Sequence, residues 1–309
     1  MAEQEKGHAE LITNLLGPSA ATECEYSYPF ETVQEFIDFC QKLTKWGESG
    51  VYGFLPHLNS RAAAQLLLQS ITTEARQQMI FRQFEGLFPM PVFFETAITQ
   101  SMAWTLLAPY ITGCSAETPM VAWQNFPALN ITNNPNATIS SNSTGATNGT
   151  ASGGATNGTA TGGATNGTTS NGTAATNGTF MPPEITTNRT SLSTAGSTVE
   201  LSGEHPGKSV GPNGSYITTS SAGEPKYAAW ISQLNITFTA LENFQNSSDG
   251  WTASTTQPDD VVYADLPENP IVNGTMFLVV TDEEITVTPH NISALNEHIV
   301  AGPAVYQAD

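Results

Sequence analysis

The sequence predicts an α+β protein with two domains, a helical bundle over residues 1–120 followed by a β-rich domain over residues 121–309. Apolar residues recur at helical spacing in the first part, whereas short alternating or continuous apolar runs, typical of strands, recur in the second. A low-complexity repeat at residues 133–195 interrupts the second part. A length of 309 residues is enough for both domains.

The composition narrows the classes of function. The formal net charge is −19, only 12% of the residues are charged, and most of the nine Lys and Arg residues precede residue 100. Binding of phosphate groups needs clustered cations, so neither nucleic acid nor an anionic membrane is an expected partner. No apolar run is long enough to span a bilayer. The first eight residues, MAEQEKGH, lack the apolar segment of a signal peptide.

Two helices are predicted before residue 56. The first covers residues 2–16, and Gly17-Pro18 ends it. Because it starts at the first residue without a capping residue, the sequence suggests that the chain begins inside a bundle whose first helix is missing. The second runs from about Thr32 to Leu55. Its last part contains glycines three residues apart, which let another backbone approach closely; they are Gly47, Gly50 and Gly53.

The third predicted helix covers residues 60–85 and contains Glu74 among apolar neighbours. A carboxylate in a core is costly unless it is paired or binds a cation. Taken alone, this segment favours the simpler interpretation that Glu74 is exposed and paired with Arg76 or Arg82. After a proline-rich break, a fourth and shorter helix is expected near residues 94–111.

The second half of the chain is expected to form a small β-sandwich. The repeat would be a loop inserted between its first and second strands. Alternating apolar and polar residues predict half-buried strands, and one continuous apolar run predicts a fully buried strand at residues 275–280. The other predicted strands are residues 129–132, 199–201, 230–238, 284–288 and 299–306.

The repeat consists of copies of the hexapeptide Gly-Ala-Thr-Asn-Gly-Thr, at residues 145–150, 154–159 and 163–168. It has no apolar periodicity, so it cannot bury enough surface to offset the loss of chain entropy on folding. We therefore expect a disordered, extended insertion.

The chemistry of the insertion lies in its Asn-x-Ser/Thr sequons, which accept N-linked glycans. Sequons are absent before residue 130 and frequent after it, and this distribution favours real glycans over a linker that never meets a glycosyltransferase. Such glycans predict a secreted or cell-surface protein. The predicted acceptors are Asn130, Asn136, Asn142, Asn148, Asn157, Asn166, Asn171, Asn177, Asn188, Asn213, Asn235, Asn246, Asn273 and Asn291.

The three cysteines lack the spacing of a metal site. Cys24 and Cys114 fall in predicted loops and form the better candidate pair for a disulfide. Cys40 lies among apolar helix residues and has the character of a small buried hydrophobe. It has no neighbouring His, and we find no nucleophile elbow, phosphate-binding loop or dinucleotide fingerprint, so no catalytic residue is proposed.

A set of carboxylates suggests a metal site between the helices. Glu5 and His8 are three residues apart on one helix face, Glu48 lies on the second helix, and Glu74 and Gln77 repeat the spacing on the third. Carboxylate-bridged di-iron bundles combine two Glu-x-x-His helices with two helices that each supply one Glu. Gln77 replaces the second His, and its amide oxygen suits calcium, magnesium or manganese better than iron. Three alternatives therefore remain: a redox-active di-iron site, a weaker or degenerate site for iron or manganese, and a metal-free bundle.

Several segments resemble the fungal ferritin-like proteins named for late sexual development or for stress response. The resemblance covers most of the chain outside the repeat and rests on residues 21–26, 50–56, 73–86, 123–127 and 301–304. It implies a ferritin-like up-down helical bundle followed by a β-rich region, in a family that normally carries a signal peptide and a further first helix. The positions that match the family's ligands are Glu5, His8, Glu48 and Glu74, whereas Gln77 departs from the usual His.

Two hypotheses of function follow. In the first, the protein is a secreted or cell-surface fungal glycoprotein, associated with the cell wall or the extracellular space, whose ferritin-like scaffold serves development or stress and carries out no defined reaction. In the second, the carboxylates and His8 make it a metal-binding protein or an oxidase of the di-iron type.

Overall fold

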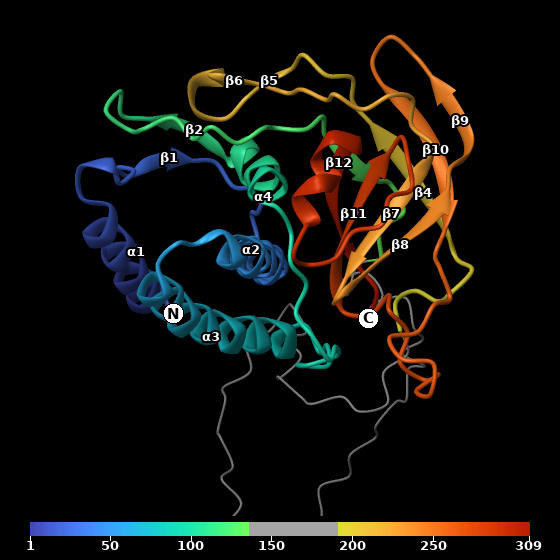
Figure 1. Ribbon diagram of the computed structural model, residues 1–309, viewed down its shortest axis with the longest axis horizontal. Helices are drawn as coiled ribbons and strands as arrows, with labels where there is room; N and C mark the ends of the chain where they lie inside the picture. Colours follow the sequence, from blue (N-terminus) through green and yellow to red (C-terminus); the bar gives the residue numbers. More distant parts are fainter. Residues whose placement is uncertain (136–190) are drawn as a thin grey trace, which may run out of the picture.

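The computed structural model describes residues 1–135 and 191–309 (Figure 1). Most of the predicted repeat, with its predicted disorder, lies outside these residues. The sequons outside them are Asn136, Asn142, Asn148, Asn157, Asn166, Asn171, Asn177 and Asn188.

The four expected helices are present in the described residues: α1 (Ala2–Leu16), α2 (Val33–Phe54), α3 (Arg61–Phe84) and α4 (Gln100–Leu107). The first three agree with the prediction, whereas α4 is much shorter than residues 94–111. The segment before α4 is irregular because it is held by tertiary contacts, including a hydrogen bond of 3.0 Å from the Ile98 N–H to the Ser49 carbonyl of α2. No described helix is long and apolar enough to cross a membrane.

The β-rich part contains two antiparallel four-stranded sheets, with the orders β3-β4-β10-β9 and β12-β11-β7-β8. Two further strand pairs, β1 with β2 and β5 with β6, form short ribbons beside the helices (Figure 1). The strands are β1 (Cys24–Tyr26), β2 (Ile111–Cys114), β3 (Leu129–Ile131), β4 (Thr198–Gly203), β5 (Ser209–Val210), β6 (Tyr216–Ile217), β7 (Tyr227–Ser232), β8 (Asn235–Ala240), β9 (Glu242–Asn246), β10 (Trp251–Thr256), β11 (Thr275–Thr281) and β12 (Ile299–Gln307).

Two predicted strands are wrong. Residues 230–238 are not one strand, because the chain reverses at Gln233 and Leu234 to form the hairpin of β7 and β8. Gln233 takes a left-handed conformation (φ 51°), which a glutamine in the sequence does not predict. Its side-chain oxygen accepts a hydrogen bond of 2.9 Å from the Phe93 N–H. Residues 284–288 alternate as a strand would but have no strand conformation, and they pair with no strand in the described part of the chain.

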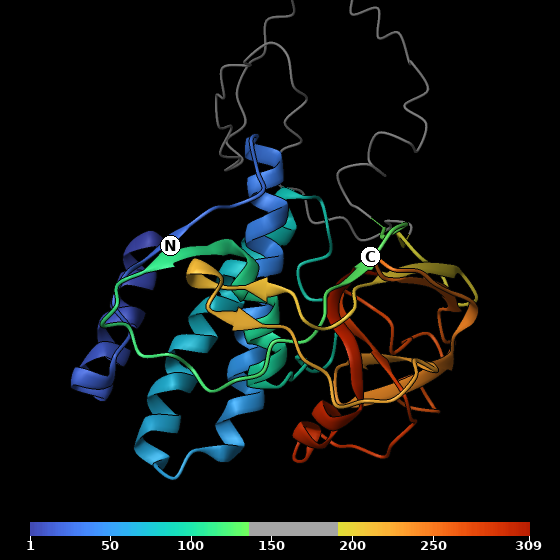
Figure 2. The same ribbon diagram turned by 90° about the horizontal axis from the view of Figure 1, so that it is seen from above.

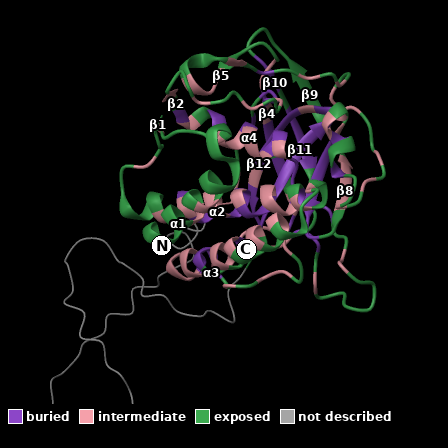
Figure 3. Ribbon diagram, turned by 60° about the vertical axis from the view of Figure 1, so that its left-hand side comes forward, coloured by how far each residue is buried: buried purple, intermediate pink, exposed green. Residues whose placement is uncertain are grey.

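Strand β11 is buried on both faces, as its continuous apolar run predicts (Figure 3). One face, with Met276 and Leu278, joins the core between the two sheets, where it meets Trp230 and Tyr306. The other face, with Phe277, joins a second core that the helices cover. The molecule therefore has three layers, with the helices on one side and the sandwich on the other (Figure 2).

The residues that belong to this second core come from both halves of the chain. From the helical part come Phe39 and Trp46 of α2, with Ile98 and Met102 at α4. From the sheet come Ala229 and Ile231 of β7, Phe277 and Val279 of β11, and Ile299 of β12. The predicted boundary near residue 120 thus divides the sequence, but the helices and the sheet share one hydrophobic core.

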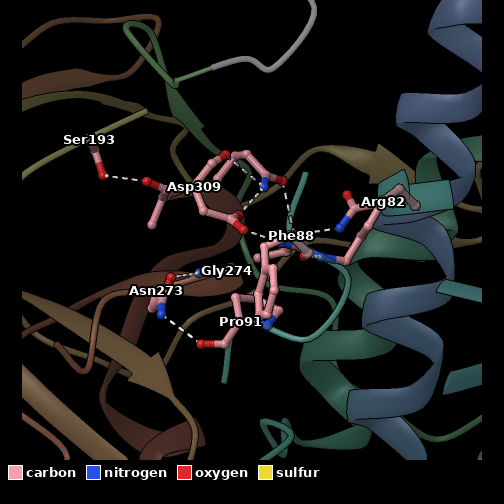
Figure 4. A network of polar contacts seen from close by, with 11 residues as sticks. Arg82, Phe88, Pro91, Ser193, Asn273, Gly274 and Asp309 are labelled. Atoms are coloured by element: carbon pink, nitrogen blue, oxygen red, sulfur yellow. Dashed lines mark hydrogen bonds and ion pairs between the residues drawn. The ribbon is translucent and has the colours of Figure 1, made fainter. Parts of the chain in front are cut away.

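A buried polar network also joins the helices to the sandwich (Figure 4). Arg82 of α3 forms an ion pair with Asp309, donates to the Phe88 carbonyl at 2.9 Å and donates to the Thr275 hydroxyl at 3.1 Å. Gln307 of β12 completes the network, because its oxygen accepts from Thr275 at 2.9 Å and its amide donates to Asp309 at 2.8 Å. Every one of these side chains is buried, so each depends on the others for its hydrogen bonds.

The glycines of α2 explain how α4 packs against it. A Cβ atom at Gly53 would lie 1.9 Å from the Ile98 carbonyl oxygen, and one at Gly50 would lie 2.9 Å from Cβ of Ala103. A Cβ atom at Gly47 would meet nothing within 4 Å. The close approach predicted from the glycine spacing is therefore confirmed at the last two positions.

Candidate metal centre

The candidate centre lies between α1 and α3, and α2 packs against α3 (Figure 1). Glu5 and His8 are one helical turn apart on α1, and Glu74 faces them from α3. Nδ1 of His8 is 3.3 Å from Oε1 of Glu74 and 3.6 Å from Oε2 of Glu5. One donor atom from each residue falls within 4.8 Å of the other two. The structure thus brings together three of the predicted ligands.

The separation of His8 and Glu74 fits a shared ion, whereas that of His8 and Glu5 is slightly longer. Two donors on one metal, each at about 2.1 Å, lie about 3.0–3.4 Å apart in octahedral or tetrahedral geometry. With a proton in place of the ion, the His8 imidazole would form ion pairs with the carboxylates of Glu5 and Glu74. The two side chains nearest the centre, His8 and Glu74, are about one-fifth exposed, and that of Glu5 is about half exposed. The centre is therefore open to solvent on the side of α1.

Gln77 supports Glu5. Its amide donates a hydrogen bond of 2.7 Å to Oε1 of Glu5 and one of 3.2 Å to Oε1 of Gln4. Because Oε2 of Glu5 is the atom nearer His8, Gln77 holds the other oxygen and orients the carboxylate. The residue that replaces the expected second His thus contacts a ligand through its amide nitrogen.

Glu48 of α2 is fully buried, and neither of its carboxylate oxygens has a hydrogen-bond partner among the described residues. Burial raises its pKa to about 8; the charges of Glu95 and Glu74 act in the same direction, and that of Lys45 opposes them. Burial also raises the pKa of Glu74 to about 7, with Glu5 adding to the shift and His8 opposing it. The structure does not place Glu48 within the group of three donors, but the charge of Glu74 contributes to the raised pKa of Glu48.

Three residues of this region escaped the sequence analysis. Glu95, from the segment before α4, forms an ion pair with Lys45, and the charges of both act on Glu48. Tyr52 lies one turn after Glu48 on α2; burial raises its pKa, and the charges of Glu48, Glu95 and Glu74 raise it further. Lys45 and Tyr52 stand three and four residues from Glu48, so helical spacing could have found them, whereas nothing in the sequence places Glu95 here.

The other predicted site residues lie away from the centre. Cys24 of β1 is joined to Cys114 of β2 by a disulfide with a Cα–Cα distance of 4.3 Å, and Cys40 is a free thiol. The described sequons lie in the β-rich part and its ribbons. Their exposed asparagines are Asn130, Asn213, Asn235, Asn246 and Asn291.

Asn273 differs from the other described sequons. It is half-buried, and the nitrogen that would carry a glycan donates a hydrogen bond of 2.7 Å to the Pro91 carbonyl (Figure 4). The hydroxyl of Thr275, the third residue of its sequon, belongs to the buried polar network around Arg82. A glycan on Asn273 would therefore separate the sandwich from the segment that leads to α4.

The helices and their inward carboxylates define the class of protein. The model of the ferritin-like domain matches residues 1–87, which take in α1, α2 and α3. Protein rds1 of Schizosaccharomyces pombe (strain 972 / ATCC 24843) is 53% identical to this chain over 310 aligned positions, which cover all of this chain and 69% of rds1. The chain therefore belongs to the same fungal family as rds1, and its own ferritin-like domain is joined to a β-rich region.

Proposed function

We propose that this protein is a secreted or cell-surface glycoprotein whose ferritin-like helices bind one divalent cation, iron or manganese. The observation that carries the proposal is the fully buried carboxylate of Glu48, which has no hydrogen-bond partner in the part of the chain that the structure describes and whose pKa the charge of Glu74 helps to raise. A buried carboxylate without a hydrogen bond is stabilised by a proton or by a cation. The convergence of Glu5, His8 and Glu74 between α1 and α3 favours the cation.

The residues divide into clear roles. Glu5, His8 and Glu74 would hold the ion, Gln77 orients Glu5, and Glu48 supplies further negative charge. A bound iron or manganese ion would supply Lewis acidity and one-electron redox chemistry. The single imidazole and the orienting amide depart from the two Glu-x-x-His helices of a di-iron oxidase, so the arrangement supports ion binding more than oxygen chemistry.

The ion content of the full-length protein tests this proposal. After loading with Mn²⁺ or Fe²⁺ and desalting, we expect one ion per chain. Glu74→Gln should abolish binding because it removes a central ligand, whereas Glu10→Gln, an exposed acid on α1, should leave it unchanged. Less than about 0.1 ion per chain in the unaltered protein would leave the helices as a scaffold without metal.

The extracellular setting is supported by the disulfide between Cys24 and Cys114 and by the exposed sequons of the β-rich part. Peptide mapping without reduction should recover Cys24 and Cys114 in one linked peptide and Cys40 as the alkylated thiol. Enzymatic deglycosylation of protein from its natural host should lower its mass. If the mass does not change and Cys24 is alkylated, the protein is not a secreted glycoprotein.

Site mapping of the glycans gives a sharper test. We expect occupancy at exposed sequons such as Asn235 and none at Asn273, because the Asn273 amide is used within the fold. Occupancy of Asn273 at a level equal to that of Asn235 would contradict this arrangement of the sandwich and the α4 segment.

The resemblance to proteins of late sexual development and stress response supports a role in one of these processes. A strain that lacks the gene should show defective sporulation or lower survival of stress, and the Glu74→Gln gene should fail to restore it if the ion is required. Full restoration by that variant would assign the role to the scaffold.

A further inference from the structure

A hollow of about 480 Å³ lies on the surface between two segments that are far apart in the sequence. Residues 122–125 form one side of it, in the segment that leads from β2 to β3. Residues 216–221 form the other side, in β6 and the segment that follows it toward β7. A parallel bridge between Asn125 and Thr218 holds the two segments side by side. No ligand of the candidate metal centre lines the hollow in the described part of the chain, so the two features are separate.

The lining of the hollow combines exposed apolar surface with polar side chains. Trp123 is 44% exposed and Ile217 is 50% exposed, so both present apolar surface to solvent there. Tyr216 is fixed, because its hydroxyl accepts a hydrogen bond of 2.9 Å from the Val121 N–H and its ring meets that of Trp104 edge-on. Among the described residues, the lining contains no Lys, Arg, His, Asp or Glu. A charged ligand would find no compensating charge in this lining, so a ligand that fits it is neutral.

Asn125 provides a second observation. The residue is only 3% exposed, and its side-chain nitrogen has no hydrogen-bond partner among the described residues. A buried donor without an acceptor is costly, so such a donor in the lining of a hollow marks a position for an acceptor atom of a ligand. Its neighbour Gln124 donates a hydrogen bond of 2.9 Å from the side-chain amide to the Thr219 carbonyl, which fixes the orientation of that amide.

We propose that this hollow binds a neutral saccharide, with one pyranose ring stacked on Trp123 and one sugar oxygen accepting a hydrogen bond from the Asn125 amide. A pyranose ring has an apolar face of C–H groups, which suits the exposed surface of an indole ring. It also has a rim of hydroxyls, which suits amide and hydroxyl side chains such as those of Gln124 and Thr219. The proposal does not depend on the binding of a metal ion by the helices.

An extended peptide fits the hollow less well, because backbone groups that would pair with it are already used. The Gln124 N–H donates a hydrogen bond of 3.2 Å to the Ser101 hydroxyl. The Thr219 N–H donates one of 2.8 Å to the Asn125 carbonyl, and the Thr219 carbonyl accepts from the Gln124 side chain. The addition of a peptide strand needs a row of free backbone groups, whereas a sugar contacts side chains.

Isothermal titration calorimetry of the full-length protein tests the proposal with two neutral sugars, a β-1,3-linked glucose oligomer and a high-mannose oligosaccharide. We expect at least one of them to bind. Trp123→Ala should weaken this binding by about tenfold, because it removes the stacking face. Tyr263→Ala is the matched control, since Tyr263 is also 44% exposed but does not line the hollow, and it should leave the affinity unchanged. Thr219→Trp, which fills the hollow from an exposed position, should also abolish binding, and it repeats the test if Trp123→Ala does not fold.

The two sugars also distinguish the natural source of the ligand. Binding of the glucose oligomer alone would point to a glucan polysaccharide, and binding of the mannose oligosaccharide alone would point to an N-linked glycan. Either result, or binding of both, supports the proposal.

Three results would overturn the proposal. The first is that neither sugar binds, or that an extended peptide binds in their place. The second is that Trp123→Ala and Thr219→Trp both bind as tightly as the unaltered protein. The third is that polygalacturonate, an anionic pyranose chain, binds as tightly as the neutral sugars, since the lining offers no cation for its carboxylates. None of these results would affect the proposed ion site, which is measured separately by its metal content.

Discussion

At the scale of single residues, the protein is distinguished by acidic side chains that are buried within its helices. Burial is the largest cause of the raised pKa of Glu48, Glu74 and Glu85. For Glu85, the neighbouring Asp38 raises the pKa further, to about 8, against the opposing charges of Lys42 and Arg82. Of the three, Glu74 belongs to the candidate centre, Glu48 lies outside its group of donors, and Glu85 lies at the end of α3.

These shifts predict that the metal-free protein loses stability as the pH rises. The folded pKa of each group lies above its unfolded value of 4.5, so the stabilisation is complete below pH 4.5 and is lost as the pH rises through about 7 to 8. Thermal melts in the presence of a chelator should show a falling midpoint between pH 5 and pH 8. Glu85→Gln should reduce this fall without affecting ion binding, and Glu10→Gln should not change it. A midpoint that rises over this range would contradict the burial of these groups.

At the scale of secondary-structure elements, the contact of α2 with the α4 segment depends on the absence of a side chain at Gly53. Its Cβ atom would overlap the backbone of Ile98, which also donates a hydrogen bond to α2. The backbone cannot move aside as a flexible side chain could. The spacing of the α2 glycines thus has a structural cause, which lies in the neighbouring segment.

Gly53→Ala should therefore destabilise the protein by roughly 1–3 kcal/mol or more, the usual cost of overpacking a core. Gly47→Ala is the matched control on the same helix, since an added methyl group there meets nothing. It should be neutral or stabilise α2 by up to about 1 kcal/mol through helix propensity. Urea unfolding of both variants measures the difference, and equal stabilities would show that α4 does not approach α2 this closely.

At the scale of the whole molecule, the helices and the sandwich are held as one unit by a shared apolar core and by the polar network around Arg82. Removal of one partner from such a network leaves a buried charge without compensation. The central position of Arg82, which contacts Thr275, Asp309 and the Phe88 carbonyl, makes it the residue on which the network depends.

Arg82→Met should lower the free energy of unfolding by about 3–5 kcal/mol, the cost of breaking a buried ion pair. Arg76→Met, an exposed position on the same helix, should change it by less than about 0.5 kcal/mol. Because the network joins the helices to the sandwich, the two parts of the unaltered protein should unfold in one transition. Far-ultraviolet circular dichroism and tryptophan fluorescence would monitor it. Two separate transitions in the unaltered protein would show that the layers are independent.

The sequence by itself determined the features that depend on neighbouring residues. The extents of α1, α2 and α3 follow from apolar periodicity and stop signals, and β11 follows from its continuous apolar run. The three-residue spacing of Glu5 and His8 alone places both on one face of α1, where the structure finds them together. Local spacing carries this information because a helix fixes the direction of each side chain.

Only the tertiary structure decided the features that join distant segments. The turn at Gln233 is stabilised by hydrogen bonds with residues 93 and 96. The side-chain amide of Asn273 donates a hydrogen bond to the Pro91 carbonyl. The position of Glu95 beside Lys45 likewise depends on how the segment before α4 crosses α2. No local pattern encodes these contacts, because they arise from the packing of whole layers against one another.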